Sequence, residues 1–193
     1  PSLIAESIRE GAFYHLTKPF QRDVLYTVVE AAVRERHQLE EVHQRLEAGT
    51  RAASLLSQAE FRFRTPEEGR ALATLLSQTC PDPYDASLGL WELLLNAVEH
   101  GNLGLSYEEK GRLLKERRLD QEIQSRLSDP RYAHRQVEVT FQRLGPSLVF
   151  LITDEGEGFD WTRYLDLDPE RAFHAHGRGI AMARHLCFTQ VTY

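Results

Sequence analysis

The chain has little cysteine and no excess of positive charge, and each shortage excludes a class of protein. Its two cysteines, Cys80 and Cys187, stand far apart and in no metal-like spacing, so we expect two reduced thiols in a reducing compartment. Lysine and arginine number 23 against 29 aspartates and glutamates, which gives a formal net charge of -6. A general nucleic-acid binder needs clustered basic residues for phosphate contacts, so no nucleic-acid partner is expected.

Long apolar runs are also lacking. No stretch approaches the ~20 residues that span a bilayer, and the first residues carry no basic-then-apolar signal. We therefore expect a cytoplasmic protein with no membrane partner. Hydrophobic residues make up 41% and charged residues 27%, within the range of ordinary globular proteins. The 193 residues suggest one full domain plus a fragment, or two small domains, and they suffice for a sizeable core.

The first part of the chain predicts a short fragment followed by a long helix. Residues 3–10 have the pattern of a helix end closed by Gly11, and residues 13–16 that of a short strand. A helical pattern then begins near Asp23. Its apolar residues recur every seven positions, at Leu25, Ala32, Leu39 and Leu46. This period is typical of a coiled-coil seam.

Two interpretations of the long helix remain open. Arg36 and His43 fall in the other apolar slot of the repeat, which weakens the coiled-coil pattern. The helix either joins two copies of the chain as a homodimer or packs singly on its own domain. We assign residues 1–24 to the fragment and residues 25–57 to this linker helix, with a break expected over residues 49–58.

The rest of the chain, residues 58–193, predicts one α/β domain. Residues 60–64 alternate like a strand, and the run from Thr65 to Glu68 combines an N-cap, a proline at the first helical position and a capping-box glutamate. Further helices are expected over residues 85–100, 106–128 and 179–186, and further strands over residues 137–141, 148–152 and 187–193. Helices followed by a hairpin predict helices that cover one face of a mixed sheet.

The first candidate functional segment runs from Glu92 to Asn102 and reads Glu-Leu-Leu-Leu-Asn-Ala-Val-Glu-His-Gly-Asn. Glu92 and Asn96 share a helix face because they lie four residues apart, opposite a predicted apolar stripe of Leu88, Trp91, Leu95 and Val98. The Asn96 amide oxygen suits Mg²⁺, and the Glu92 carboxylate suits a base that deprotonates a nucleophile. Taken alone, such a pair is more often two solvated polar residues.

The second candidate segment, Asp154-Glu155-Gly156-Glu157-Gly158-Phe159, directly follows an apolar strand. A carboxylate at a strand end, here that of Asp154, can accept a hydrogen bond from an adenine amino group. Gly156 and Gly158 would let the backbone approach a planar base and turn sharply. An ordinary acidic loop with two turn glycines explains this segment alone about as well.

The third candidate segment, His176-Gly177-Arg178-Gly179-Ile180, opens the last predicted helix. Gly177 and Gly179 before a helix N-terminus would expose backbone N–H groups to an anion such as a triphosphate, and Arg178 would add positive charge. A flexible loop with a helix cap is the plainer interpretation of one glycine pair.

Together, in this order and spacing, the three segments resemble the GHKL (Bergerat) ATP-binding family, and within it the anti-sigma-factor serine/threonine kinases. The resemblance covers residues 58–193 and implies a two-layer α/β sandwich that binds ATP and Mg²⁺. It implies that Asn96 coordinates the metal, that Glu92 is the catalytic base and that Asp154 holds adenine. It also implies that four glycines shape the pocket and its lid over residues 159–176, namely Gly156, Gly158, Gly177 and Gly179, and Arg178 stands between the last two.

The chain departs from this family at two places. The predicted excursion over residues 106–128 is longer than the family pattern leads one to expect. The family pattern also continues, past the position of Tyr193, into another strand that helps to close the adenine pocket. We therefore expect the domain to lack its last strand and to bind ATP more weakly as a result.

The opening residues resemble a different family. The run from Gly11 to Phe20, Gly-Ala-Phe-Tyr-His-Leu-Thr-Lys-Pro-Phe, is similar to the last strand of a response-regulator receiver domain. The resemblance implies that Lys18 is a phosphate-sensing lysine. The acceptor aspartate of such a domain would lie before Pro1. A strand-ending turn at Lys18-Pro19 is the plainer alternative.

The two resemblances together imply an ATP-binding regulatory protein of a response-regulator system. We expect a serine/threonine kinase, with an anti-sigma-factor antagonist or a sigma-factor-like protein as its partner. A non-catalytic, ATP-dependent partner-binding switch remains an alternative, although it has no need of a base such as Glu92. The ATPase domain of a histidine kinase is the other alternative, but His37 and His43 in the linker lack the proline-containing flank of the common phospho-acceptor box.

Overall fold

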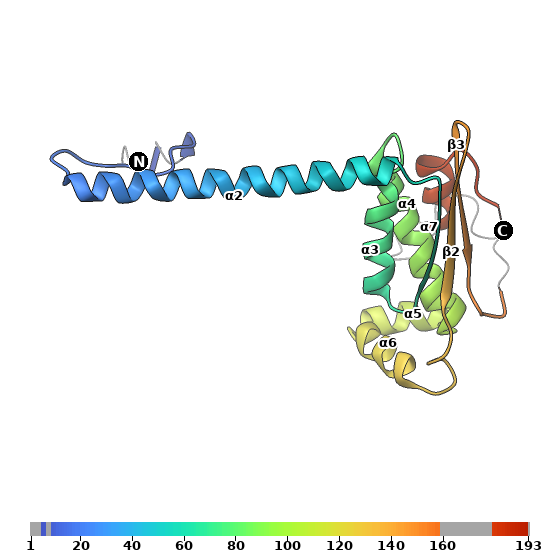
Figure 1. Cartoon of the computed structure of the whole chain (residues 1–193). Helices are drawn as coiled ribbons and strands as arrows, with labels where there is room; N and C mark the ends of the chain where they lie inside the picture. The colour runs from blue at the N-terminus through green and yellow to red at the C-terminus, as the bar shows by residue number, and fades with distance from the viewer. Residues whose placement is uncertain (1–4, 7–8, 159–178, 193) are drawn as a thin grey trace. The chain divides into compact units, whose positions relative to one another are not determined.

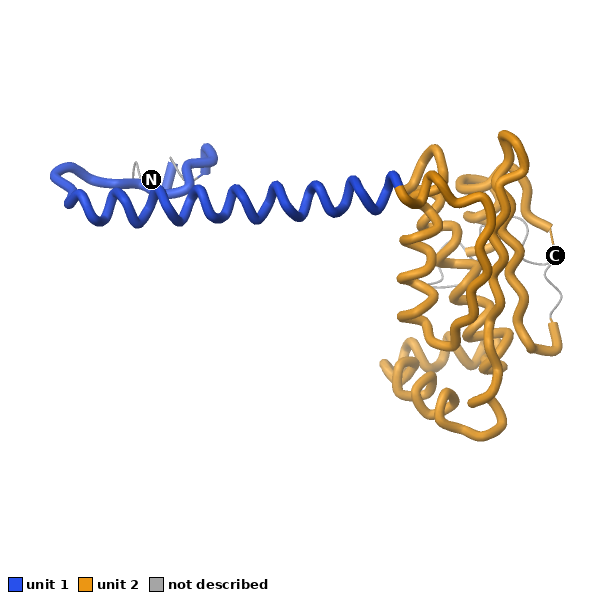
Figure 2. The backbone as a smooth tube through the Cα atoms, viewed as in Figure 1, with its two compact units in different colours: residues 1–51 blue, residues 52–193 orange. Residues whose placement is uncertain are grey.

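The computed structural model describes residues 5–6, 9–158 and 179–192, and the chain divides into two units, residues 1–51 and 52–193 (Figure 2). The fold is mixed α/β, with helices and an antiparallel sheet. Among the described residues, no helix is both long and apolar enough to cross a membrane. Cys80 and Cys187 are both free thiols, and burial raises the pKa of each.

The first unit is dominated by one long helix, α2, which spans Arg22–Ser54. Asp23 lies in its first turn and Arg51 in its last, which places both charges favourably in the field of the helix dipole. The prediction of a helix from about Asp23 is therefore confirmed. Its charged flanks form pairs one turn apart, such as Arg36–Glu40 at 3.0 Å and His43–Glu47 at 3.1 Å.

The expected strand over residues 13–16 does not form. A strand needs a neighbour to satisfy its backbone N–H and C=O groups. The described part of this unit holds no other strand with which it could pair. The side chains of Phe13 and Tyr14 are exposed. The alternating pattern of these residues was therefore not sufficient to predict a strand.

The second unit is built on a three-stranded sheet of β1 (Gln58–Phe63), β2 (Val137–Leu144) and β3 (Ser147–Thr153), in the order β1-β2-β3. Both strand pairs are antiparallel, so the expectation of a mixed sheet is wrong for the described residues. The reason is the connectivity, because β2 and β3 form a tight hairpin at Gly145 (φ 61°). The hairpin itself was predicted correctly.

One face of the sheet carries the core. Along β2, Val137, Val139 and Phe141 are buried while Glu138 is exposed, as the two-residue period of a strand requires. Helices α3 (Pro66–Ser77) and α4 (Pro83–Asn96) lie on the buried face (Figure 1). The predicted helices over one face are therefore present. The core that they share with the sheet includes Leu72, Leu76, Leu90, Leu94 and Val98.

Helix α3 begins as its sequence predicts. The Thr65 hydroxyl accepts from the Glu68 N–H at 3.2 Å, and the Glu68 carboxylate accepts from the Thr65 N–H at 3.0 Å. These reciprocal bonds make a complete capping box with Pro66 at the first helical turn. The backbone N–H groups of Arg64 and Thr65 also lower the pKa of the Glu68 carboxyl. The capping box therefore fixes where the first covering helix starts.

The predicted apolar stripe of α4 was placed on the wrong residues. The buried positions are Ala86, Gly89, Leu90 and Leu94. Leu88 is exposed, and Trp91 and Leu95 are only half-buried. Val98, just beyond the helix, is buried as predicted. The error arises because α4 is apolar on several sides and is covered on more than one, by α3 and by the helical residues near the C-terminus. Hydrophobic spacing alone does not select one face of such a helix.

The chain beyond Asn96 differs from the single helix that was expected. The last turn widens into a π-helix, η1 (Ala97–Asn102), and two short helices follow, α5 (Tyr107–Lys115) and α6 (Leu119–Ser128). Arg117 lies between them with a positive φ of 55° and ends the first of the two. The helical excursion is therefore confirmed, but as two helices joined by a tight turn.

The last helical segment is also short. Helix α7 (Gly179–Met182) continues into the π-helix η4 (Ala183–Cys187), which agrees with the predicted helix over residues 179–186. The predicted final strand is not formed, because residues 188–192 pair with no strand in the described part of the chain. Phe188 has an extended backbone, and its ring packs near that of Phe150 at a centroid distance of 6.2 Å. Side-chain packing, not strand pairing, therefore holds this end of the chain.

Candidate functional site

Two of the three candidate segments meet at Gly101 and Asp154. A β-carbon added to Gly101 would overlap the Asp154 carboxyl group, with its Oδ2 at only 2.7 Å. A β-carbon on Gly156 would in turn lie 2.6 Å from the carbonyl oxygen of Gly101. Real β-carbons do not approach other atoms so closely, so this meeting requires glycine at both positions. The loop after β3 and the end of η1 are therefore in close contact, through the Asp154 carboxyl group and the backbone of the two glycines.

The third segment meets the first at Gly179 and Glu92. A β-carbon on Gly179 would lie 3.1 Å from Cβ of Glu92 and would overlap its carboxylate. Gly179 is the first residue of α7 and is buried, and Glu92 lies on α4 and is half-buried. Segments separated by more than eighty positions in the sequence are thus placed in contact beside α4.

Asn96 lies one turn beyond Glu92, at the point where α4 ends and η1 begins. Its side chain is half-buried. A π-helical turn at this place shifts the residues that follow relative to α4, and such turns occur often at functional sites. The structure thus keeps Glu92 and Asn96 on one side of the helix, as their spacing predicts.

Asp154 is the first residue after β3. Its Oδ1 accepts a hydrogen bond from the Gly156 N–H at 2.9 Å, which closes a tight turn of the backbone. The side chain is half-buried, so part of the carboxylate can be reached from solvent. Gly158 follows with a positive φ of 75°, in the region of the backbone map that favours glycine. These features suit a carboxylate that is held in place and reachable by a ligand.

Other predicted site residues lie outside the described residues. These are Gly177 and Arg178, together with the predicted lid over residues 159–176. Of the predicted site residues in the third segment, Gly179 alone lies within the described part of the chain.

Sequence reasoning missed Asn102, the last residue of η1. Its carboxamide Oδ1 accepts from the Glu155 N–H at 2.8 Å, and its backbone carbonyl accepts from Arg135 Nη1 at 3.0 Å. The Glu155 carboxylate accepts from the Gln136 N–H at 2.8 Å. The position of Asn102 directly after His100-Gly101 was its only signal in the sequence. It ties the first segment to the second by a side-chain hydrogen bond.

Sequence reasoning also missed a buried ion pair behind the site. Glu99 of η1 pairs with Lys110 of α5, and their side chains are only 3% and 11% exposed. Next to it, His100 Nδ1 donates to the Leu105 carbonyl at 2.5 Å, which assigns the proton of the neutral ring to Nδ1. Burial lowers the pKa of His100, and the nearby Lys110 lowers it further. Helix α5 is therefore fastened to the candidate segment by charge and hydrogen bonding.

The described residues contain no cluster of three or more histidine, cysteine, aspartate or glutamate side chains that could hold a metal ion. A Mg²⁺ site does not need one, because Mg²⁺ keeps several waters and is often held by one or two protein ligands plus phosphate oxygens. Asn96 is the described side chain that the sequence predicts for that role.

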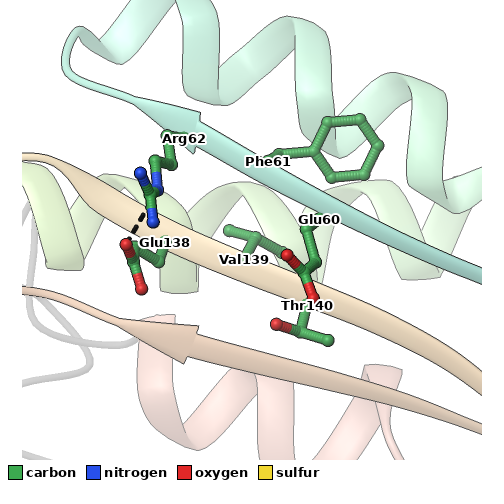
Figure 3. A pocket seen from close by; sticks show the side chains of 6 residues that line it. All are labelled: Glu60, Phe61, Arg62, Glu138, Val139 and Thr140. Carbon is green, nitrogen blue, oxygen red and sulfur yellow. Dashed lines mark ion pairs between the residues drawn. The ribbon is translucent and has the colours of Figure 1, made fainter.

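A separate hollow of about 480 Å³ lies over the sheet strands (Figure 3). Its lining comes from β1 and β2 and includes no predicted site residue; it consists of Glu60, Phe61, Arg62, Glu138, Val139 and Thr140. Arg62 and Glu138 face each other across the strands at 2.8 Å, but both are largely exposed. An exposed pair of this kind contributes little. We therefore place the candidate site at the meeting of the three segments and not at this hollow.

Comparisons with protein families, with curated proteins and with solved structures give no match to this chain.

Proposed function

We propose that residues 58–193 form an ATP-binding domain of the GHKL type, a two-layer α/β sandwich, that acts as a serine/threonine kinase in a response-regulator system. The observation that carries the proposal is the convergence of the three candidate segments. Gly101 lies against Asp154, and Gly179 lies against Glu92, although these positions are remote in the sequence. These contacts bring the carboxylate of Asp154 and the Glu92–Asn96 pair, all predicted from the sequence, toward one place.

The residues present fit a bound nucleotide. Asp154 offers a held, half-buried carboxylate to the amino group of adenine. The glycines at 101, 156 and 179 let the three segments pack closely on one another, because an added β-carbon would meet Asp154, the Gly101 backbone or Glu92. This close packing gathers Glu92, Asn96 and Asp154 around one place, as a shared nucleotide pocket would require. Gly158, Gly177 and Arg178 would complete the same pocket and its lid.

The proposed chemistry is phosphoryl transfer to a serine or threonine of a partner protein. When bound, Mg-ATP supplies the γ-phosphoryl group and part of the charge neutralisation that its transfer needs. Asn96 would hold the metal through its amide oxygen. Glu92 would orient the partner's hydroxyl group and take its proton on a carboxylate oxygen. The four-residue spacing of Glu92 and Asn96 on α4 keeps these two tasks adjacent.

The partner that this proposal implies is an anti-sigma-factor antagonist or a sigma-factor-like protein. We also propose that α2 joins two copies of the chain. Leu39, Val42 and Leu46 share one helix face and are exposed, with Leu39 and Leu46 65% and 66% exposed. An apolar stripe with a seven-residue period can pack against the same stripe of a second helix in a coiled coil. In a single exposed helix the stripe stays in contact with water. The opening residues would be the end of a receiver domain that controls the kinase through α2.

An incubation of the chain with γ-labelled ATP and an anti-sigma-factor antagonist tests the proposed function. We expect labelled phosphoserine or phosphothreonine on the antagonist, and Glu92→Gln lowers the rate by about 100-fold or more, as loss of a general base does. Glu157→Gln, an exposed acid of the second segment with no assigned task, serves as the matched control and keeps the rate. Binding of ATP without labelled partner would favour the switch instead, and labelled histidine would favour the histidine-kinase alternative.

A further inference from the structure

We infer that Asn102 is a positioning residue that sets the selectivity of the site for the adenine base; this inference rests on the proposed function. Asn102 is only 2% exposed, although it is a polar residue at the end of η1. A buried carboxamide is retained at a net cost unless its hydrogen bonds serve the fold or a ligand. The contacts of Asn102 therefore indicate its task.

The orientation of the Asn102 side chain is set by Glu155. The Glu155 backbone N–H is a donor, so the group that faces it at 2.8 Å must be the carboxamide oxygen and not the nitrogen. Among the described residues the Asn102 amide nitrogen has no hydrogen-bond partner. The hydrogen bond to Glu155 is therefore the contact through which the side chain acts on the described fold.

Fixing the peptide of Glu155 also fixes Asp154, because the two residues share that peptide bond. The same stretch is held on its other side, where the Glu155 carboxylate accepts from the Gln136 N–H. One residue before Asn102, Gly101 lies against the Asp154 carboxyl group. Two successive residues of the first segment thus contact two successive residues of the second. This double contact determines where the Asp154 carboxylate lies.

The turn that carries Asn102 is itself anchored by arginines. Arg135 donates to the Asn102 carbonyl at 3.0 Å, and Arg126 of α6 donates to the Leu103 carbonyl at 2.9 Å. Arg126 is in turn paired with Glu109 of α5 and Glu122 of α6. Charge-assisted bonds of this kind are stronger than neutral ones. The helical excursion therefore acts as a rigid support for the residue that positions Asp154.

Adenine selectivity is the property that such positioning controls. The carboxylate of Asp154 can accept from the 6-amino group of adenine, whereas inosine triphosphate presents a carbonyl oxygen at that place and cannot donate. A site that bonds the 6-amino group binds ITP more weakly because ITP lacks that donor. This preference requires the Asp154 carboxylate to lie in the correct place. Displacing Asp154 lowers this preference, whereas the contacts to the triphosphate are unchanged.

Calorimetric titration of the full chain with Mg-ATP and with Mg-ITP tests the inference. We expect Asn102→Ala to lower the ratio of the two dissociation constants by about tenfold, the usual effect of one misplaced charge-assisted hydrogen bond. Thr79→Ala is the matched control, because it removes a buried side-chain bond, from Thr79 Oγ1 to the Leu76 carbonyl at 2.7 Å, that touches no site residue. The control keeps the ratio even where it lowers the melting temperature.

The outcomes separate this inference from the proposed function. A wild-type chain that prefers ATP and an Asn102→Ala chain with the same preference overturn the inference alone. A wild-type chain that binds neither nucleotide overturns the proposed function and the inference with it. If Asn102→Ala does not fold, Arg135→Met removes the support of the Asn102 carbonyl, together with the contact of Arg135 over the Tyr132 ring, and leaves the Asn102 side chain in place. A partial loss of preference in Arg135→Met then supports the inference, and full retention overturns it.

Discussion

Gly101 and Asp154 lie in direct contact, and the contact leaves no room for even one methyl group on the glycine. It joins the end of η1 to the loop after β3, so it brings the segment that carries Asn96 next to the carboxylate assigned to adenine. The contact is thus both a packing constraint and the geometric basis of the proposed site.

Gly101→Ala tests this contact. The new methyl group would overlap the Asp154 carboxyl group, which must then move or push the loop away. We expect loss of measurable Mg-ATP binding and destabilisation of about 1–3 kcal/mol, the usual cost of overpacking. Calorimetry measures the first and urea unfolding the second.

Gly49→Ala is the matched control for that variant. Gly49 lies in α2 with nothing within 4 Å of an added β-carbon. Its replacement should leave ATP binding unchanged and stabilise the helix by up to ~1 kcal/mol. Equal ATP affinity in wild-type and Gly101→Ala chains would show that Asp154 is not placed by Gly101.

Gly179→Ala should affect transfer more than binding. The added methyl group would overlap the Glu92 carboxylate, the flexible end of that side chain, which can swing aside; it would also lie 3.1 Å from Glu92 Cβ, which requires only a small shift. Stability should therefore change by less than in Gly101→Ala, while phosphoryl transfer falls because the base is displaced. Side-by-side measurement of Kd and single-turnover rate checks this; a variant with weaker binding and an unchanged rate would contradict it.

Lys110→Met tests the buried ion pair. It leaves Glu99 charged and without its ionic partner in a site where both side chains are almost fully covered. Loss of one partner of a buried pair destabilises by about 3–5 kcal/mol, and the double change Glu99→Met, Lys110→Met should recover much of this. Arg62→Ala, from the exposed Arg62–Glu138 pair, is the control and should cost less than ~1 kcal/mol. Similar free energies of unfolding for Lys110→Met and Arg62→Ala would show that the Glu99–Lys110 pair does not stabilise the fold.

The stability of the domain should fall on mild acidification because of His100. Burial lowers the pKa of His100 in the folded chain below its ordinary value of 6.5, so the unfolded chain binds the proton more readily. The free energy of unfolding is then unaffected above 6.5 and decreases as the pH falls from there through the lower folded pKa.

His100→Asn is the variant that isolates this effect. Its amide nitrogen can replace the Nδ1 donor to the Leu105 carbonyl, but it does not titrate. Urea unfolding at a series of pH values should show a smaller decrease in the variant than in the wild type. A wild-type decrease no larger than that of the variant would contradict the assignment to His100.

Paired substitution on α2 tests the homodimer. The double change Leu39→Glu, Leu46→Glu places charges on the exposed apolar stripe and should reduce the mass in sedimentation equilibrium to that of one chain, 22.2 kDa. His37→Glu, on the opposite helix face, should keep the wild-type mass. A wild-type chain that sediments as a monomer at every concentration would exclude the dimer.

Local features of the fold could be predicted from the sequence. The capping box of Thr65 and Glu68 and the hairpin at Gly145 depend on neighbouring residues alone, and both form as predicted. The buried face of α4 could not be predicted, because leucines of α4 lie on several sides of the helix. Which of them are buried depends on the elements that pack against α4. The strand predicted over residues 13–16 failed for the same kind of reason, since pairing depends on residues elsewhere.

The candidate site likewise has local features that the sequence predicts and long-range contacts that it does not. Glu92 and Asn96 could be placed on one helix face because the spacing is local. The bond from Asn102 to Glu155 joins positions 53 apart, and the Glu99–Lys110 pair depends on how α5 folds back. Neither has a periodic signal, so only the tertiary structure reveals them.

Calorimetric titration of the full chain with Mg-ATP, in the wild type and in Asn96→Ala and Asp154→Asn, tests most directly whether this site binds ATP. We expect saturable binding to the wild type with one site per chain, and binding weakened at least about tenfold in each variant. Saturable binding that both variants retain, or no binding by a folded wild-type chain, would contradict the assignment of this site to ATP.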